Sequence, residues 1–261
     1  MMRCLWTAAT GMEAQQTNMD TIANNLANAN TTGYKESRAN FADLMYQTIV
    51  APGASNSNNN KVPAGIQIGM GVGTASVEKM FAQGNFTQTS NNLDLAIQGN
   101  GFFQVMRGNE ECYTRDGSFS VNQNGNIVDA DGYALQPQVT LPPTAVSVSI
   151  DPSGVLTATD SQGNVVATAN LQICMFPNPA GLQAIGDNYY IQTLSSGNVI
   201  TAQPGGPQGA GTILQGYLEA SNTNVVDEMV NMITSQRAYE ANSKVIKSAD
   251  QMLQMANNVV S

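Results

Sequence analysis

The sequence predicts an α+β fold in which N- and C-terminal α-helices form a coiled-coil-like core domain and an all-β domain is inserted between them. Both ends of the chain carry apolar residues at every seventh position, the middle alternates apolar and polar residues, and stretches rich in Pro, Gly and Asn separate these parts. The expected segments are an N-terminal helical segment (1–45), an extended linker or strap (46–90), a β-rich outer domain (91–200), a return linker (201–216) and the C-terminal helix of the core (217–261).

The two terminal segments share a heptad repeat, the period at which one face of a helix packs against another helix. The repeat falls on Leu5, Met12, Met19 and Leu26, with Ile22 beside it, and at the other end on Val225, Met232, Tyr239, Ile246, Leu253 and Val260. At 1.5 Å per residue, helices over 5–30 and 225–260 would extend about 39 and 54 Å, which is longer than a compact domain requires. The repeats therefore predict self-assembly seams, where helices of neighbouring subunits pack together.

The middle of the chain has the pattern of strands joined by tight turns. "IQGNGFFQV" and "CYTRDGSFSVNQNGNIVDADGYALQP" alternate apolar and polar residues. Asn124-Gly125 and Asp131-Gly132 favour turns because Gly adopts positive φ without steric cost. An all-β domain over 91–200 is expected.

A low-complexity piece, "YQTIVAPGASNSNNNKVPAG" (46–65), follows the first helical segment. Pro52 and Pro63 restrict its backbone, and Tyr46, Ile49 and Val50 offer apolar anchors, whereas 55–60 is too polar to fold alone. Two interpretations stay open: a strap that becomes ordered across neighbouring subunits, or a disordered spacer.

The charge distribution excludes several classes of partner. No Lys or Arg occurs over 116–236, a stretch with nine acidic residues, and the whole chain has a net charge of −9. A phosphate-binding surface needs the opposite sign, so no nucleic acid and no anionic membrane surface is expected as a partner. No apolar run approaches the ~18 residues of a membrane span, so membrane insertion is not expected either.

Catalytic, metal and cofactor sites are not expected. The chain contains no histidine, the commonest general base and metal ligand, and its three cysteines are far apart without a C-x-x-C pair. Glu110, Glu111 and Asp116 could supply a carboxylate pair, which leaves a carboxylate-based glycosidase as one alternative. An extracellular β-rich adhesin is the other, because it would explain the polar middle of the chain.

Long terminal motifs resemble those of the axial proteins of the bacterial flagellum, the rod and hook family. "IANNLANANTTGYK" is similar to their N-terminal signature, "VNMITSQRAYEANSKVIKSADQMLQ" to their C-terminal helix, and "IQGNGFFQV" with the stretch after it to their β domain. The resemblance covers nearly the whole chain and departs from the family at the initial "MMRC". The residues of the N-terminal motif are Asn24, Asn25, Leu26, Ala27, Asn28, Gly33, Tyr34 and Lys35.

This resemblance, which is strongest to subunits of the distal rod, implies a structural role without catalysis. It implies helical polymerisation into a hollow, rigid shaft that carries torque from motor to hook and conducts exported subunits. The implied partners are copies of itself, proximal rod proteins, the hook protein, P-ring and L-ring proteins and the flagellar type III export apparatus. The implied location is the basal body, from periplasm to outer membrane, reached without a cleaved signal peptide. In the family motif the Asn residues would bond to neighbouring chains, and 46–65 would be the strap that keeps the rod straight.

Overall fold

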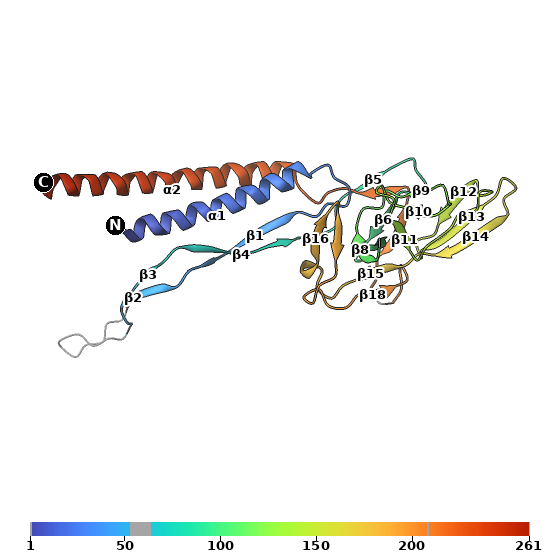
Figure 1. Ribbon diagram of the computed structural model, residues 1–261, viewed down its shortest axis with the longest axis horizontal. Coiled ribbons are helices and arrows are strands. Elements are labelled where there is room, and N and C mark those ends of the chain that lie inside the picture. Colours follow the sequence, from blue (N-terminus) through green and yellow to red (C-terminus); the bar gives the residue numbers. More distant parts are fainter. Residues whose placement is uncertain (1, 53–63, 208, 261) are drawn as a thin grey trace. The chain divides into compact units, whose positions relative to one another are not determined.

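The computed structural model describes residues 2–52, 64–207 and 209–260, which fold into two compact units. The first, called the helix unit, comprises Met1–Ala27, Ser37–Lys79 and Asn224–Ser261. The second, called the β unit, comprises Asn28–Glu36 and Met80–Thr223. The predicted α+β class is confirmed, with a helix at each end of the chain (Figure 1).

The helices are α1 (Met2–Ala27) and α2 (Val225–Val260). Asn224 caps α2, because its Oδ1 accepts the N–H of Val226 at 3.1 Å. Asp227 and Glu228 in the first turn favour the positive end of the helix dipole. Neither helix contains Pro, so both run without a break.

The two helices lie antiparallel and contact each other, so that the start of α1 and the end of α2 lie at the same end of the pair (Figure 1). Small and polar residues, seven positions apart on each helix, form the line of contact. The facing pairs are Gly11 with Asn242, Asn18 with Ser235, and Asn25 with Glu228. A Cβ at Gly11 would lie 2.9 Å from the amide nitrogen of Asn242, so a larger residue there would require the Asn242 side chain to move. The contact within one chain therefore falls beside the apolar heptads.

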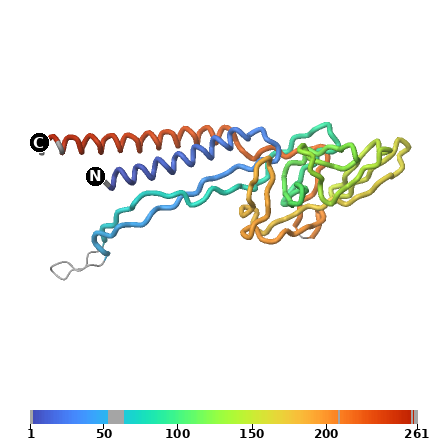
Figure 2. Tube along the Cα trace, in the orientation of Figure 1, coloured from blue at the N-terminus to red at the C-terminus, as the bar shows by residue number. Residues whose placement is uncertain are grey.

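A long two-stranded ribbon completes the helix unit (Figure 2). Its antiparallel pairs are β1 (Ser37–Asp43) with β4 (Val72–Lys79) and β2 (Tyr46–Val50) with β3 (Ile66–Gly69). β1 and β4 lie against α1. Most of β2 and β3 is exposed, including Tyr46, Ile49, Ile66 and Ile68.

A seven-stranded antiparallel sheet forms the framework of the β unit, in the order β16-β17-β8-β7-β11-β10-β9. Its strands are β7 (Phe103–Arg107), β8 (Glu110–Thr114), β9 (Ser120–Val121), β10 (Ile127–Val128), β11 (Ala134–Gln136), β16 (Gln183–Gly186) and β17 (Tyr189–Ile191). Gly125 and Gly132 adopt φ of +80° and +87° in the turns after β9 and β10, at the predicted Asn-Gly and Asp-Gly positions. The sheet ends in β16 at one edge and β9 at the other.

Four smaller sheets and one 3₁₀ turn pack around this framework. The strands are β12 (Ser147–Ile150), β13 (Val155–Thr159) and β14 (Val165–Asn170) in one sheet, β15 (Ile173–Met175) with β18 (Ile200–Ala202), β6 (Leu95–Gln98) with β19 (Thr212–Gln215), and β5 (Phe86–Gln88) with β20 (Tyr217–Glu219). The 3₁₀ turn is η1 (Pro179–Gly181).

Two buried clusters hold the β unit together. The larger one joins aliphatic residues of several sheets with the edge-to-face pair of Phe103 and Phe119, whose ring centres are 5.2 Å apart. The smaller one is aromatic and includes Phe102, Tyr113 and Tyr190. Edge-to-face contacts among such rings add to the free energy gained from their burial.

Several segment boundaries in the structure differ from those predicted from the sequence. α1 ends at Ala27, three residues before the expected helix end at 30, because the Asn-Thr-Gly turn follows it, and the expected N-terminal segment 1–45 also contains β1. The expected linker 46–90 contains β2, β3, β4 and β5, and the expected return linker 201–216 contains β19 and most of β18. Their Gly and Pro content suggested open chain, but each strand finds a hydrogen-bonded partner. The β unit accordingly extends beyond 91–200.

Candidate functional site

The predicted seam residues are only partly covered within one chain. Buried or half-buried positions are Leu5, Met12, Met19, Ile22, Leu26, Met232, Ile246 and Leu253. Val225 and Tyr239 are exposed, at 40% and 38%. The side chain of Val260 lies outside the described residues. The half-buried and exposed seam residues therefore keep some apolar surface in contact with solvent.

A second apolar face on α2 was missed by the heptad analysis. Val226, Val230 and Ile233 are 68%, 54% and 49% exposed, and their spacing places them on one side of the helix. Trp6 on α1 is 63% exposed. The spacing of i, i+4 and i+7 in "VVDEMVNMI" is the signal that could have found this face. Exposed apolar side chains gathered on one face are common at protein–protein contact surfaces.

The Asn-rich motif joins the end of α1 to the start of β1. The Asn25 amide donates from Nδ2 to the Ser37 carbonyl at 2.8 Å and accepts the Ser37 N–H on Oδ1 at 2.8 Å. Asn25 is buried, whereas Asn24 and Ala27 are exposed. The expectation that the amides of the motif bond to neighbouring chains is therefore wrong for Asn25, since the main chain of its own subunit uses both ends of this side chain.

Within the β unit, Gly33 makes a close approach that no other residue could make. Its φ is +68°, and a Cβ there would lie 2.6 Å from the backbone nitrogen of Asp116. Its own N–H donates to the carbonyl of Glu219 at 2.8 Å. The turn thus needs both the left-handed conformation and the missing side chain. The next two residues, Tyr34 and Lys35, are buried.

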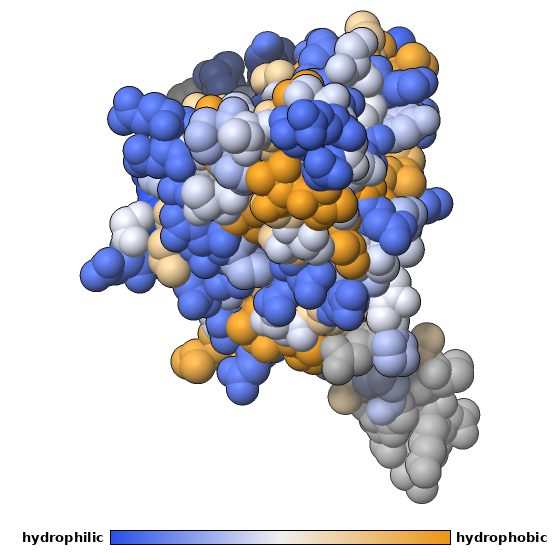
Figure 3. Space-filling model, turned by 90° about the vertical axis from the view of Figure 1, so that its right-hand side faces the viewer, coloured by the Kyte–Doolittle hydropathy of each residue, from blue (hydrophilic) through white to orange (hydrophobic). Residues whose placement is uncertain are grey.

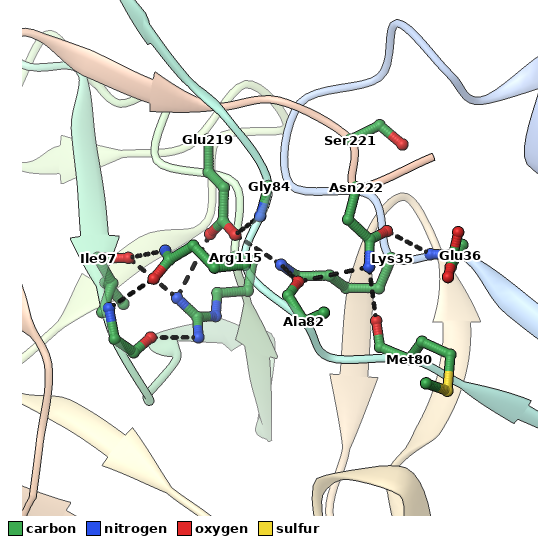
Figure 4. Close-up of polar contacts among 12 residues, drawn as sticks. Lys35, Glu36, Met80, Ala82, Gly84, Ile97, Arg115, Glu219, Ser221 and Asn222 are labelled. Atoms are coloured by element: carbon green, nitrogen blue, oxygen red, sulfur yellow. Dashed lines mark hydrogen bonds and ion pairs between the residues drawn. The ribbon is translucent and has the colours of Figure 1, made fainter. Parts of the chain in front are cut away.

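Lys35 ends in a buried ion cluster, defined here as Lys35, Arg115 and Glu219 (Figure 4). Lys35 Nζ lies 2.6 Å from Glu219 Oε1 and donates to the Ala82 carbonyl at 2.8 Å. Arg115 Nη1 lies 3.3 Å from Glu219 Oε2, and its Nη2 donates to the Gly99 carbonyl at 2.7 Å. Both Lys35 and Glu219 have fully buried side chains.

Burial dominates the electrostatics of this cluster. It lowers the pKa of Lys35 and the pKa of Arg115, and the attraction of Glu219 opposes but does not cancel this effect. Charges taken out of water need such partners, because their loss leaves an uncompensated charge in a medium of low polarity. The cluster joins three parts of the chain that are distant in sequence. Both carboxylate oxygens of Glu219 are bound by cations of its own subunit. Sequence reasoning missed Arg115 and Glu219.

Asn222 ties together the backbone segments beside this cluster (Figure 4). Its Oδ1 accepts the N–H of Glu36 at 2.8 Å, and its Nδ2 donates to the carbonyl of Met80 at 2.9 Å. The N–H of Met80 donates in turn to the carbonyl of Glu36 at 2.8 Å. These three residues stand at or near the points where the chain enters or leaves the β unit, so one side chain fixes their spacing.

The described strap residues lie on the ribbon of the helix unit. Tyr46 and Ile49 are exposed and Val50 is half-buried on β2, while Pro52 follows the strand in an exposed turn. Pro63 and the polar stretch 55–60 lie outside the described residues. Part of the expected strap is therefore β structure paired with β3.

The acidic residues of the glycosidase alternative lie on β8 and in the turn that follows it. Glu110 and Glu111 are exposed on β8, and Asp116 Oδ1 accepts the N–H of Ser118 at 3.1 Å in a turn. In the described part of the chain, no group of three or more Cys, Asp or Glu is placed to hold a metal ion. Neither described helix has a stretch apolar enough to span a bilayer.

Comparison with known proteins gives three family matches along the chain. Residues 5–35 match the family described as flagella basal body rod protein, 96–158 the D1 domain of flagellar hook protein FlgE/F/G, and 214–259 the C-terminal part of flagellar basal body rod FlgEFG protein. The first match contains the Asn-rich motif through Lys35, and the last contains Glu219 and Asn222.

Several similar proteins are matched over nearly their whole length. The flagellar basal-body rod protein FlgG of Caulobacter vibrioides is 48% identical over 261 residues, which cover 99% of each chain. FlgG of Buchnera aphidicola subsp. Schizaphis graminum is 46% identical over 97% of this chain and 98% of its own. FlgG of Bacillus subtilis is 36% identical over 99% of both chains.

Proposed function

This chain belongs to the flagellar basal-body rod protein family, and we propose that it builds the distal rod as a hollow, rigid shaft that carries torque from motor to hook and conducts exported subunits. The family consists of structural rod subunits and not of enzymes. Self-assembly into the rod within the flagellar complex follows from this membership. The relatives give no support to the adhesin or glycosidase alternatives.

One observation carries the proposal of a helical polymer: apolar side chains stay exposed on helices that are already paired. Val226, Val230, Ile233 and Trp6 all face outward, and the half-buried seam residues offer further surface. Fully burying a large apolar side chain contributes about 1.5–3 kcal/mol. Contact with neighbouring copies would bring these residues out of water.

In this polymer the terminal helices of many copies would form a coiled-coil-like core that lines the inner wall. The all-β part, an insertion between the helices in sequence, would form the outer wall. The heptads support this arrangement, because their apolar stripe is distinct from the polar line of contact between α1 and α2.

The proposed partners of the finished shaft are proximal rod proteins at one end, the hook protein at the other, and P-ring and L-ring proteins around it. The proposed location runs from periplasm to outer membrane. Export would use the flagellar type III apparatus without a cleaved signal peptide. Family membership supports these partners, and the packing of α1 against α2 and the ribbon supports retention of the N-terminal segment.

We also propose that 46–65 acts as a strap that keeps the rod straight. Support comes from Tyr46 and Ile49, which extend from an exposed strand at 56% and 54% exposure. Apolar side chains on an extended ribbon can reach a neighbouring subunit and resist sliding.

The test of the proposed function is sedimentation of the purified chain at raised concentration, with and without 1–27 and 224–261. These boundaries keep Lys35, Arg115 and Glu219 in the truncated protein, so that its β unit retains the ion cluster. The full chain should form sedimenting polymers and the truncated one should not, while the circular dichroism of its buried tyrosines stays unchanged. Polymers of the truncated chain, or a full chain that stays monomeric, would contradict the proposal.

A further inference from the structure

Leu194 is held fully outside the β unit. Its relative exposure is 104%, the largest among the exposed large hydrophobic residues of the described chain. It follows β17 in the sequence "QTLSSGN", where a polar residue would be the ordinary choice for a turn. Within one subunit this side chain gains nothing from its position.

Hydrogen bonds hold the loop that carries Leu194 in its conformation. Thr193 N–H donates to Ser196 Oγ at 3.0 Å, and Ser196 Oγ donates to the Thr193 carbonyl at 2.8 Å. Asn178 Nδ2 donates to the Ser195 carbonyl at 3.1 Å, which fixes the loop to the segment before η1. Ser196, two residues after the exposed leucine, is fully buried. A preorganised side chain loses little conformational entropy when a partner covers it.

An uncharged apolar groove lies elsewhere on the β unit. Its volume is about 440 Å³, and Asn122, Gln123 and Asn124 form part of its wall. The apolar wall residues include Leu93, Val121, Leu141, Pro142, Ala145 and Val148. A backbone hydrogen bond joins two parts of its wall, since Leu141 N–H donates to the Gly125 carbonyl at 2.7 Å. The end of the β unit that carries β12, β13 and β14 shows hydrophobic residues gathered in a patch with hydrophilic residues around it (Figure 3). The name apolar groove is used below for the groove with the six apolar wall residues from Leu93 to Val148.

The loop and the groove belong to opposite edges of the seven-stranded sheet. Leu194 follows β17, next to the β16 edge, and Val121 lies on β9, the other edge strand. One subunit therefore cannot place its own Leu194 in its own groove without unfolding. A contact between two different surfaces, repeated from copy to copy, is heterologous and builds an open chain of subunits.

Charge favours these two surfaces as the points of contact between copies. The β unit holds eleven Asp and Glu against three Lys and Arg, a net charge of −8, so copies repel each other over much of their surface. Neither the residues lining the groove nor the loop 192–198 includes a charged residue. Contact there brings no like charges together.

We propose that Leu194 of one subunit inserts into the apolar groove of a neighbouring copy, as a lateral contact between β units. The proposal rests on the proposed function, because it assigns one contact within the homopolymer. The partner is a second copy of this chain. The contact would couple β units independently of the helix seams.

Cysteine cross-linking tests the pairing directly. Chains with Leu194→Cys and chains with Val121→Cys, both with Cys4→Ser, are mixed, polymerised and treated with a short bismaleimide. Cys112 and Cys174 are buried and should not react. Covalent dimers should form in the mixture and not with either chain alone. Dimers of Leu194→Cys chains alone, or a polymerised mixture without dimers, would overturn the proposal.

A second measurement compares critical concentrations for polymerisation. Leu194→Ser should raise this value about ten-fold or more, because the buried contact of one leucine is lost. Val165→Ser is the matched control, since Val165 is 60% exposed on β14 outside the groove, and it should leave the value unchanged. Equal values for wild type and Leu194→Ser would overturn this contact while the proposed function stands. A wild-type chain that never polymerises would instead contradict the proposed function.

Discussion

Glu219→Gln removes the carboxylate that both cations of the buried ion cluster share. Its Oε1 lies 2.6 Å from Lys35 Nζ and accepts the Gly84 N–H at 3.0 Å, and Oε2 lies 3.3 Å from Arg115 Nη1. Glutamine keeps the shape and one acceptor but not the charge. Breaking a buried ion pair on one side costs about 3–5 kcal/mol, and we expect the free energy of unfolding of the β unit to fall by that amount.

Two spectroscopic signals separate the units during urea unfolding. The single Trp6 belongs to α1, so its fluorescence reports the helix unit. Buried tyrosines such as Tyr113 and Tyr190 belong to the β unit, so near-ultraviolet circular dichroism reports that part. The loss of stability should appear as an earlier tyrosine transition.

The matched control is Glu78→Gln, which breaks an ion pair of nearly equal length. Arg38 Nη2 lies 2.7 Å from Glu78 Oε1, but the side chains are 59% and 33% exposed. Water solvates both partners when such a pair is broken, so the stability should stay nearly unchanged. If Glu219→Gln proves as mild as Glu78→Gln, the reasoning from burial is refuted.

Three further changes give separate tests. Gly33→Ala should destabilise the β unit by roughly 1–3 kcal/mol more than Gly108→Ala, because φ is positive at both (+68° and +64°) but only Gly33 has backbone within 4 Å of a Cβ; equal urea midpoints would contradict this. Burial raises the pKa of Cys174 from 9.0 to about 11. Folding therefore favours the neutral thiol, and the free energy of unfolding should fall by about 2–3 kcal/mol between pH 9 and 11. Urea unfolding of Cys174→Ala should show a smaller fall, and an equal fall would contradict the assignment. Deletion of 47–64, which removes most of β2, should leave shafts that form but bend in electron micrographs; shafts as straight as the parent would show that the segment is a spacer.

The terminal helices could be predicted from the sequence because their apolar period is local. The face on which they meet within one chain could not. Apolar heptads and the polar line through Gly11, Asn18 and Asn25 have the same period, so spacing alone does not tell which stripe meets the partner helix. The structure assigns the polar stripe to contact within the chain.

The turns of the β unit could also be predicted, since the positive φ of Gly125 and Gly132 depends on local sequence alone. The ion cluster could not be predicted, because Lys35 and Glu219 are 184 residues apart and no local sequence pattern pairs them. Glu219 lies in the acidic stretch 116–236, yet its side chain is buried. The pairing of distant charges depends on the tertiary fold, and a single sequence does not show which charges pair.

Electron cryomicroscopy of polymers assembled from the purified chain tests the central claim most directly, because it locates each part of the subunit in the wall. We expect a straight, hollow shaft in which α1 and α2 line the inner wall and the β unit forms the outside. A solid filament, or a tube whose inner wall is built from the β unit, would contradict the account.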